Sequence, residues 1–516
     1  MHGMHHLPGV VPLYTAVEMR TVDRLAIDEV GLPSAVLMER AGLGAAGEIL
    51  NWFPDAKTIA VVCGPGHNGG DGFVVARHLA AAGRHVRVLL VEAVSKVRRD
   101  SQIFLDVLEK LHIPATRVNV TAWRSSLEGV DLVIDAMLGT GVSGAPKPPY
   151  EAAIRAIESS LLPVVALDVP TGVDASDGTI AGSAIRADLT VTFHAPKVGL
   201  AVAPGRFHAG RVKAIDIGIP AHVEEPTRQG IATPALLSML PERRREGSKY
   251  DATVLAIGGS VGMSGAIALT ARAAMRAGAG VVWAAVPDRI APALDIAIPE
   301  VQFRGMLSDD QGRMTVAAAE RLEDLVGKTD TVVIGPGIGD GDQVRALARW
   351  AVRSARALVL DAQGISAFAE DTQSLAARDG APTLLTPHEG ELARLLGVSS
   401  DDVRARRLHH ALEAARLTRS TVLLKGEDSI IALPGGDFLV VGGHRAQATA
   451  GTGDVLAGVA GALMARGLDP VLAAACASLG CSIAAERAAA DLDANGVVAG
   501  DLIDRLPAAL AQRVVS

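Results

Sequence analysis

The residues of this chain best suited to chemistry lie in a glycine-rich segment near the C-terminus. Residues 447–454 read QATAGTGD, and the apolar run at 455–464 that follows them predicts a buried helix. Glycines at 451 and 453 would let a ligand approach the backbone closely, and the free N–H groups of a helix N-terminus attract anions. Asp454 could then take a proton from a hydroxyl group while the N–H groups hold the charge of a transferring phosphate. A glycine-rich helix start with an ordinary N-terminal Asp is the simpler alternative.

A second glycine-rich segment follows a predicted strand in the first half of the chain. The strand covers residues 58–63 (TIAVVC) and leads into GPGHNGGDG at 64–72. A helix over 73–82 and a second strand over 85–92 complete a βαβ unit. The glycine-rich first turn of such a unit is the usual place for a phosphate.

The glycines of this segment also match the dinucleotide-binding pattern G-x-G-x-x-G, so ordinary Rossmann use is an open alternative. Two features favour a different role. The loop is expected to continue through Gly70-Asp71-Gly72 instead of entering a helix after Gly69, and it carries the polar residues Asn68 and Asp71. Such side chains suit contact with a ligand or a cation more than tight helix–strand packing.

Three further predicted strands end in polar or glycine-rich loops. The strands at 130–136, 164–169 and 187–193 lead into MLGTGVSG, PTGVD and HAPKVGL. In an open parallel sheet, ligands bind outside the carboxyl ends of the strands, so these loops should converge on one crevice. Asp135 and Asp168 each follow apolar strand residues and are expected at its floor, although a single strand-end Asp can be only a turn-former.

Four motifs, GPGHNGGDG, DAMLGTGVSG, DVPTGVD and ADLTVTFHAPKVGL, resemble the YjeF N-terminal domain, the NAD(P)H-hydrate epimerase family, over about residues 13–220. The resemblance implies that a potassium ion is held by Asn68, Asp135 and Thr171. Asp168 is our choice for the acid/base group of the epimerisation. The hydrated dinucleotide is implied to contact His67, Asn68, Gly69, Gly70, Asp71, Gly139, Thr140, Gly141, Val142, Ser143, Gly144, Ala145 and Asp168.

Strand–helix alternation restarts after the stretch 220–247, whose prolines and arginines indicate a linker or domain edge. Predicted strands at 252–257, 331–334, 357–360, 383–385 and 421–424 each run into a polar or glycine-rich turn. His388, after a proline turn, could be a structural helix cap or a ligand contact. Lys425, which follows a buried strand, could be a surface residue or could reach a phosphate.

Five motifs of this half, GGSVGMSGA, VVIGPGIG, LTPHEGEL, LLKGEDS and AGTGDVLAG, resemble the ribokinase-like dehydratase family over roughly residues 230–510. The resemblance implies that the hydrated cofactor contacts Ala266, Gly337, His388 and Asp454. The adenine nucleotide is implied to be held by Lys425, Gly426, Glu427, Asp428, Ser429 and Gly453. The whole chain is therefore similar to the family of fused, bifunctional NAD(P)H-hydrate repair enzymes.

The resemblance implies two steps on one damaged cofactor. The first domain would interconvert the R and S hydrates of NADH or NADPH (NADHX and NADPHX) at nicotinamide C6. The second would remove water from the S hydrate with ADP or ATP as co-substrate and Mg²⁺. Hydroxide is a poor leaving group and phosphate a good one, so Asp454 as base would let the C6 hydroxyl be phosphorylated and then expelled. No Walker lysine motif, H-E-x-x-H or G-x-S-x-G occurs, so those enzyme classes lack support.

Length and composition predict an α/β protein of two or three domains. The 516 residues exceed one ordinary domain, and 49% hydrophobic residues with 3% aromatics and 55 glycines indicate Ala/Val/Leu/Ile cores with many tight turns. We expect a Rossmann-like domain over 13–225 and a ribokinase-like α/β domain over 230–516. A net charge of −8 without a long Lys/Arg run argues against nucleic-acid binding.

Cysteine usage and hydropathy predict where the protein resides. Its three scattered cysteines lack metal-ligand spacing and fit a reducing compartment. The N-terminus has no signal-peptide pattern, and the longest uncharged run, 471–485, is too short to span a bilayer and is expected to be a core helix. We therefore expect a cytoplasmic homo-oligomer with neither a membrane nor a nucleic-acid partner.

Two rival functions make different predictions. A sugar or vitamin kinase fused to a dinucleotide-binding domain would release a stable phosphorylated product. A non-catalytic nucleotide sensor would tolerate the loss of Asp454 without a change in any turnover. Neither rival accounts for the four motifs of the first half.

Overall fold

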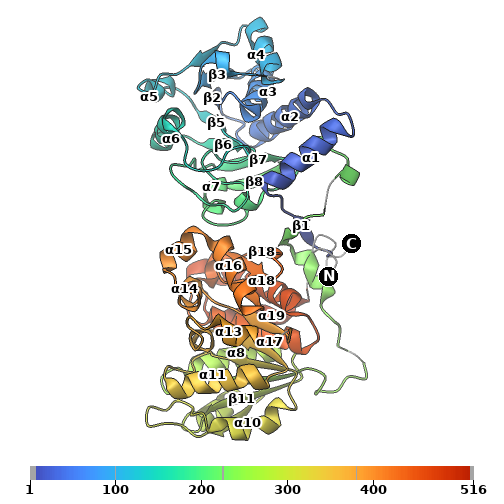
Figure 1. Ribbon diagram of the computed structural model, residues 1–516, viewed down its shortest axis with the longest axis vertical. Helices are drawn as coiled ribbons and strands as arrows, with labels where there is room; N and C mark the ends of the chain where they lie inside the picture. The colour runs from blue at the N-terminus through green and yellow to red at the C-terminus, as the bar shows by residue number, and fades with distance from the viewer. Residues whose placement is uncertain (1–6, 99, 224–225, 244, 379, 512–516) are drawn as a thin grey trace. The chain divides into compact units, whose positions relative to one another are not determined.

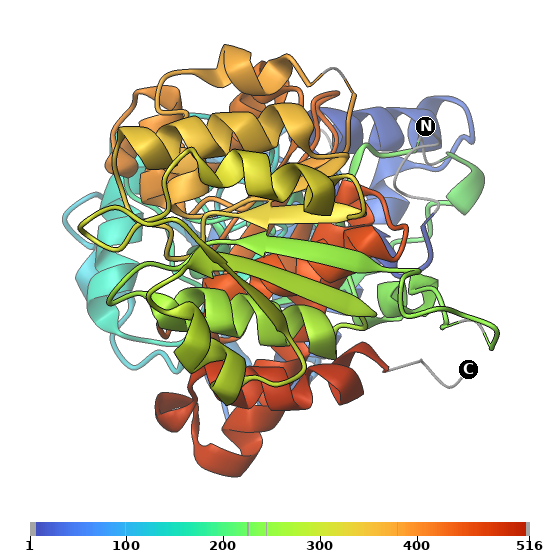
Figure 2. The ribbon, with the colours of Figure 1, turned by 90° about the horizontal axis from the view of Figure 1, so that it is seen from below.

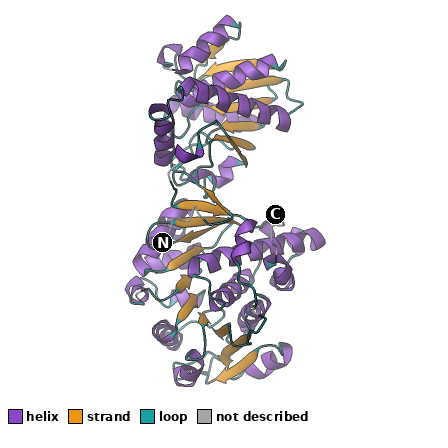
Figure 3. Cartoon of the chain, turned by 90° about the vertical axis from the view of Figure 1, so that its right-hand side faces the viewer, coloured by secondary structure: helices purple, strands orange, loops and turns teal. Residues whose placement is uncertain are grey.

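Two separate β-sheets organise the chain. The computed structural model describes residues 7–98, 100–223, 226–243, 245–378 and 380–511. One compact unit is formed by Pro12–Thr227, and the other by Met1–Val11 together with Arg228–Ser516. In each unit helices cover the strands of one sheet (Figure 1, Figure 3). The predicted two-domain α/β fold is thereby confirmed.

The sheet of the unit Pro12–Thr227 has seven strands, each parallel to its neighbours. Several of its strands are buried along their whole length, which is why they are unbroken apolar runs in the sequence. Chain order reverses between β2 and β5, and a ligand crevice opens at such a switch point. Across the sheet the strands are β4 (Ala115–Arg117), β3 (His85–Leu90), β2 (Thr58–Cys63), β5 (Leu132–Ala136), β6 (Val164–Leu167), β7 (Leu189–Phe193) and β8 (Arg211–Ile215).

Local signals explain where the helices of this unit begin. The Thr15 hydroxyl accepts a hydrogen bond from the Glu18 N–H at 3.2 Å, and the Glu18 carboxylate accepts one from the Thr15 N–H at 2.7 Å, which forms a capping box. Proline stands in the first turn of the helix that starts at Pro148. The longer helices are α1 (Ala16–Asp28), α2 (Ser34–Trp52), α3 (His67–Ala81), α4 (Asp100–Lys110) and α6 (Pro148–Ser160).

Helix α3 begins earlier than the sequence predicts. It starts at His67 instead of residue 73, so the expected long loop is wrong and is reduced to Gly64-Pro65-Gly66. Tight packing explains the difference: a Cβ on Gly69 would stand 1.9 Å from the carbonyl oxygen of Gly64, and one on Gly72 would stand 2.6 Å from the Cβ of Ala136. The glycines let the helix lie directly on the strand ends, which outweighs their low helix propensity.

The sheet of the second unit has eleven strands. Its parallel part runs from β12 to β16, and β17 is antiparallel to both β16 and β18. Chain order reverses between β10 and β13, which places a second switch point there. Across the sheet the strands are β1 (Val10–Pro12), β9 (Gln229–Ala232), β18 (Phe438–Gly442), β17 (Asp428–Ala432), β16 (Thr421–Leu424), β15 (Thr383–Leu385), β14 (Ala357–Leu360), β13 (Thr331–Ile334), β10 (Thr253–Ile257), β11 (Val281–Pro287) and β12 (Gln302–Met306).

Helices lie on both sides of these strands (Figure 2). Among the described residues, one helix, α18, is long and apolar enough to cross a membrane, but 72% of its apolar window is buried inside the protein, so it packs as the predicted core helix. The longer helices of this unit are α8 (Ser264–Arg276), α10 (Ala318–Val326), α11 (Asp342–Ser354), α14 (Glu389–Leu396), α16 (Arg407–Thr418), α17 (Thr452–Ala465), α18 (Pro470–Leu492) and α19 (Ala499–Leu510).

The stretch 220–247, predicted as a linker, contributes part of the second unit. It contains β9 and the short helix η5 (Pro234–Met239), whose Leu236 and Leu237 are buried in the core. The N-terminal segment completes this edge, because the carbonyl oxygen of Gly9 accepts hydrogen bonds from the N–H and the hydroxyl of Thr233 at 2.8 and 2.9 Å. Because this stretch is rich in proline and charged residues, its sequence did not predict β9 or η5.

This edge predicts which fragments of the second unit are stable. A fragment of residues 248–516 lacks β9, Leu236 and Leu237, whereas a fragment of residues 228–516 keeps all three. Because a buried leucine side chain contributes about 2–5 kcal/mol, the shorter fragment should unfold at a clearly lower urea concentration. Urea titration followed by circular dichroism measures this difference, and equal midpoints would contradict a structural role for the edge.

Candidate active sites

The first candidate site is a cavity of about 730 Å³ at the carboxyl ends of the strands of the seven-stranded sheet. Its wall is formed by α1, the first turns of α3 and the loops after β5, β6 and β7. The strand ends are joined there, because the Gly64 N–H donates to the carbonyl oxygen of Ala136 at 3.0 Å. The predicted positions that line this cavity are His67, Asn68, Asp71, Gly139, Thr140, Gly141, Val142 and Asp168.

The remaining positions predicted for this site lie elsewhere around it. Ser143 and Gly144 line a smaller cavity that shares Leu138, Gly139 and Val142 with the larger one. Ala145 is exposed. Gly69 and Gly70 are buried within α3, where their Cα atoms face neighbouring chain segments instead of the cavity.

Asn68 lines the cavity, and Asp135 and Thr171 form a buried polar pair that contacts the cavity-lining Leu138. Thr171 donates to the Asp135 carboxylate from its hydroxyl at 2.7 Å and from its N–H at 2.8 Å. Burial raises the pKa of Asp135 to about 6, although these hydrogen bonds act in the opposite direction. The side-chain amide of Asn68 is buried without a hydrogen-bond partner among the described residues. Oxygen ligands with an unsatisfied amide fit a hard cation, as the sequence predicts for these three residues.

Asp168 is held by a lysine that sequence reasoning passed over. Its Oδ1 accepts an ion-pair hydrogen bond from the Lys197 Nζ at 2.6 Å. Lys197 is buried, and its Nζ also donates to the Thr192 hydroxyl at 2.8 Å and to the Phe193 carbonyl oxygen at 2.7 Å. The backbone of Asp168 has φ of +63°, a strained value for a residue other than glycine that is common at functional sites. Lys197 lies in the HAPKVGL motif, so its position after a buried strand was the available signal.

The second candidate site lies at the switch point of the eleven-stranded sheet. The loops after β10 and β13 contact each other, because the Ser260 hydroxyl donates to the Gly337 carbonyl oxygen at 2.9 Å. Gly337 also lies against Ala266, whose Cβ would be 2.9 Å from a Cβ added to the glycine. The Thr270 hydroxyl is 3.0 Å from the Ala266 carbonyl oxygen and 3.1 Å from that of Asp454, so α8 and α17 meet here.

Asp454 lies in the first turn of α17, as the sequence predicts. The helix begins at Thr452 after Gly451, whose φ of +90° requires glycine. Burial, together with the carboxylates of Asp361 and Glu391, raises the pKa of Asp454 to about 7 against the opposing effect of Lys425. A carboxylate with this pKa suits proton abstraction near neutral pH.

Lys425 faces this carboxylate cluster and is not a surface residue. Its Nζ is 2.8 Å from Asp361 Oδ1 and 3.7 Å from Glu391 Oε2, and a Cβ on Gly453 would stand 3.3 Å from it. Burial alone would lower the pKa of Lys425, but the adjacent carboxylates raise it, so the ammonium stays charged. The site therefore holds one fixed cation among three carboxyl groups.

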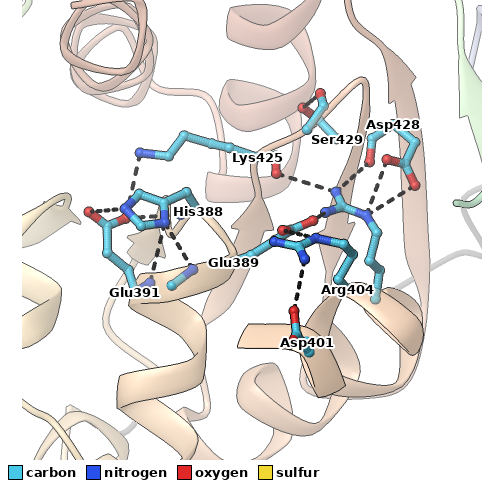
Figure 4. Close-up of polar contacts among 11 residues, drawn as sticks. His388, Glu389, Glu391, Asp401, Arg404, Lys425, Asp428 and Ser429 are labelled. Carbon is cyan, nitrogen blue, oxygen red and sulfur yellow. Dashed lines mark hydrogen bonds and ion pairs between the residues drawn. The ribbon is translucent and has the colours of Figure 1, made fainter. Parts of the chain in front are cut away.

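His388 is a helix cap, which is one of the two roles that the sequence left open. Its Nδ1 accepts a hydrogen bond from the Gly390 N–H at 2.9 Å, and the Glu391 carboxylate accepts one from the His388 N–H at 2.9 Å, which caps α14. The His388 side chain is 55% exposed, so its ring can still contact a ligand. Figure 4 shows the ring next to Glu391, whose Oε1 is 3.4 Å from the ring Nε2.

A buried arginine, Arg407, supports the loop Lys425–Ser429 through hydrogen bonds and ion pairs. Arg407 Nη2 donates to the carbonyl oxygens of Lys425 at 3.3 Å and Asp428 at 3.2 Å. The guanidinium also pairs with the carboxylates of Asp428 at 3.2 Å and Glu389 at 2.7 Å. Asp428 is thus turned inward, whereas the Ser429 hydroxyl donates to the Gly426 carbonyl oxygen at 3.1 Å (Figure 4). Through Glu389, the contacts of Arg407 join the loop to the start of α14.

Both halves of the chain match known protein families. Residues 34–199 match the family described as YjeF-related protein N-terminus, and residues 254–508 match the family described as NAD(P)H-hydrate dehydratase. The chain is 37% identical over 511 residues to the bifunctional NAD(P)H-hydrate repair enzyme of Moorella thermoacetica, which covers 96% of each chain. It is 38% identical over 529 residues to the protein of the same name from Salinibacter ruber, which covers 97% of this chain and 96% of that one.

One solved structure also matches the second half of the chain. It is the ADP/ATP-dependent NAD(P)H-hydrate dehydratase from Bacillus subtilis co-crystallized with ATP and Mg²⁺. The two sequences are 29% identical, and the match covers 53% of this chain and 94% of that one with a TM-score of 0.47.

The contacts of Arg407 predict a large difference in the free energy of unfolding between two neighbouring substitutions. Arg407→Met would remove a buried guanidinium that pairs with the carboxylates of Asp428 and Glu389, so we expect the free energy of unfolding to fall by roughly 3–5 kcal/mol. Arg404 also pairs with Glu389, but its side chain is 64% exposed, so Arg404→Met should change stability by less than about 1 kcal/mol. Urea titration of both variants measures the difference. Equal losses in the free energy of unfolding would contradict a structural role for the buried Arg407.

Proposed function

The chain belongs to the family of bifunctional NAD(P)H-hydrate repair enzymes, and on that premise we propose that it repairs hydrated nicotinamide cofactors in two steps. The first unit interconverts the R and S forms of NADHX and NADPHX at nicotinamide C6. The second unit removes water from the S form and consumes ADP or ATP. The matches to both families favour this function over a small-molecule kinase fused to a dinucleotide-binding domain.

The observation that carries the dehydration step is the placement of Asp454 beside Lys425 at the start of α17. Asp454 takes the proton of the C6 hydroxyl, whose oxygen attacks the terminal phosphorus of the nucleotide and forms a phosphoester. The C6–O bond then breaks with its electrons on the departing phosphate, while the N1 lone pair forms an N1=C6 double bond. Loss of a proton from C5 restores the reduced nicotinamide. ADP is converted to AMP and phosphate, or ATP to ADP and phosphate.

The remaining residues of this site bind and orient the reactants. Lys425 and the N–H of Gly453 hold the nucleotide phosphates, together with the rest of the loop Lys425–Ser429. Ala266, Gly337 and His388 contact the hydrated nicotinamide. The carboxylates of Asp361 and Glu391 carry more negative charge than Lys425 neutralises, and their oxygen atoms would suit Mg²⁺ as ligands. When bound, Mg²⁺ supplies neutralising charge for the phosphates.

In the first unit, Asp168 handles protons at C6 of the hydrate. Its carboxylate pairs with Lys197, and both residues line the cavity. The glycine loop at 139–145 and the start of α3 bind the dinucleotide. Asn68, Asp135 and Thr171 hold K⁺, which supplies a positive charge at the edge of the cavity when bound.

The proposal includes the boundaries and the setting of the protein. We assign the epimerase domain to residues 13–225 and the dehydratase domain to residues 230–516. The protein acts in the cytoplasm, which agrees with three cysteines that are buried and free, and it forms a homo-oligomer.

A direct assay tests the proposed function. Chemically hydrated NADH is incubated with the protein and with ADP or ATP, and recovery of the reduced-nicotinamide absorbance is followed. We expect recovery from both epimers with nucleotide present and none without it. Accumulation of a stable phosphorylated product would support the kinase alternative instead.

Asp454→Asn should abolish most of the dehydration while sparing nucleotide binding. The substitution keeps size and hydrogen-bonding reach but removes the base, which contributes roughly 10²–10⁴-fold in rate. Because the base acts when ionised and its pKa is about 7, wild-type kcat/KM should rise with pH up to about 7 and then level off. Steady-state kinetics on the S hydrate and calorimetric titration with ADP provide the measurements. Loss of nucleotide binding together with turnover would make Asp454 a phosphate–metal ligand instead of a base.

Asp135→Ala should weaken epimerisation and leave dehydration of the S hydrate unchanged. The substitution removes the central carboxylate of the predicted potassium site, which belongs to the first unit alone. Rates are measured on the separate R and S hydrates, with potassium replaced by sodium as a comparison. Equal loss of both activities would indicate general misfolding.

A further inference from the structure

Asp23 brings a third carboxyl group to the wall of the first cavity. It lies in the middle of α1, outside residues 34–199 that match the family. Its side chain lines the cavity beside those of Asp71 and Asp168, and it is half-buried. Among the described residues, its carboxyl group forms no hydrogen bond and no ion pair. A partly buried carboxyl group without a structural partner is available to a ligand.

The charges around the cavity distinguish Asp23 from Asp168. Lys197 pairs with Asp168 at 2.6 Å. Burial, together with the charge of Asp168, raises the pKa of Asp23 to about 6 against the opposing effects of Lys197 and His67. The other charged groups of the wall are those of Arg20, Arg24 and Asp71. The cavity thus offers one carboxyl group that is paired with an ammonium and one that holds a proton more firmly than an ordinary aspartate.

Asp71 is a less suitable proton donor than Asp23. Burial, together with Asp168 and Asp23, raises the pKa of Asp71 well above its ordinary value. Asp71 is buried whereas Asp23 is half-buried, so Asp71 is less accessible to the water that must exchange protons with the donor in each turnover. Asp71 also belongs to the first turns of α3, which we assign to dinucleotide binding.

We propose that Asp23 is the proton donor of the epimerisation and acts together with Asp168 as its base, an inference that rests on the proposed function of this cavity. The Asp23 carboxyl protonates the C6 hydroxyl, and the C6–O bond breaks with its electrons on the departing water. The N1 lone pair forms an N1=C6 double bond. Water adds to the other face of C6 and gives its proton to Asp168. A proton returns from Asp168 to Asp23 through water, so atoms and charge balance over the cycle.

This pair meets a requirement of the reaction. Inversion at C6 removes oxygen from one face and adds it to the other, so it needs a group that gives a proton and a group that takes one. Asp23 comes from α1 and Asp168 from the loop after β6, so the two groups lie on different elements of one wall. The two carboxyl groups also suit the cationic ring that forms between the two steps.

Asp23→Asn in the full-length protein tests this role, with Asp28→Asn as its matched control. Asp28 belongs to the same helix but is exposed. We expect Asp23→Asn to lower the rate at which the enzyme converts the R hydrate of NADH by roughly 10²–10⁴-fold, because the amide cannot donate the proton. The spontaneous rate is subtracted from both measurements. Turnover of the S hydrate with ADP should be unchanged, and Asp28→Asn should match wild type in both assays.

The pH profile separates a proton donor from a structural residue. Because the donor acts when protonated, wild-type kcat/KM for epimerisation should fall as pH rises through about 6. This limb should vanish in Asp23→Asn and return in Asp23→Glu, which keeps the carboxyl group. Wild-type rates in Asp23→Asn, or a slowed variant that keeps the limb, would overturn the inference. A wild-type protein that converts the S hydrate but not the R hydrate would overturn the proposed epimerase function itself.

Discussion

A lysine ammonium paired with a strand-end aspartate lies at the centre of both active sites. Lys197 pairs with Asp168 at 2.6 Å in the first unit, and Lys425 pairs with Asp361 at 2.8 Å in the second. Removing either charge from water is favourable only when a partner of opposite sign is fixed beside it. Each pair therefore requires its strand, its loop and the following helix to meet at one point. The rest of each crevice is built around that meeting point.

The pairs also determine the protonation of the groups that surround them. Once each lysine is committed to one aspartate, the other carboxyl groups nearby lie in a poorly solvated, negative environment. This raises the pKa of Asp454 to about 7 and that of Asp23 to about 6. Carboxyl groups of the same kind thus acquire different roles, since one is paired with an ammonium and another can exchange a proton near neutral pH. The same excess of negative charge explains why bound cations suit both sites.

Close packing of glycine supports this arrangement mechanically. Gly69 and Gly72 allow α3 to lie directly on the ends of β2 and β5, and Gly451 allows α17 to start where its free N–H groups face Lys425. In the second site, Arg407 holds the loop Lys425–Ser429 from below through two carbonyl oxygens and two carboxylates. Rigid support of this kind fixes the distances between reacting groups before a ligand binds.

The sequence by itself determined the fold, the family and most strands. The strands at 58–63, 331–334, 357–360, 383–385 and 421–424 have the predicted bounds, because fully buried parallel strands are short apolar runs that end at glycine or polar residues. It also located Asp454 in the first turn of a buried helix. The roles of individual site residues stay predictions.

Only the tertiary structure decided what depends on contacts between distant residues. The early start of α3 results from packing against two strands, and the strand β9 inside the predicted linker depends on its neighbours β1 and β18. Lys197, Arg407 and Asp23 have no distinctive local pattern, because their importance comes from the charges that folding places beside them. Burial and neighbouring charge act through space, so a linear sequence does not display them.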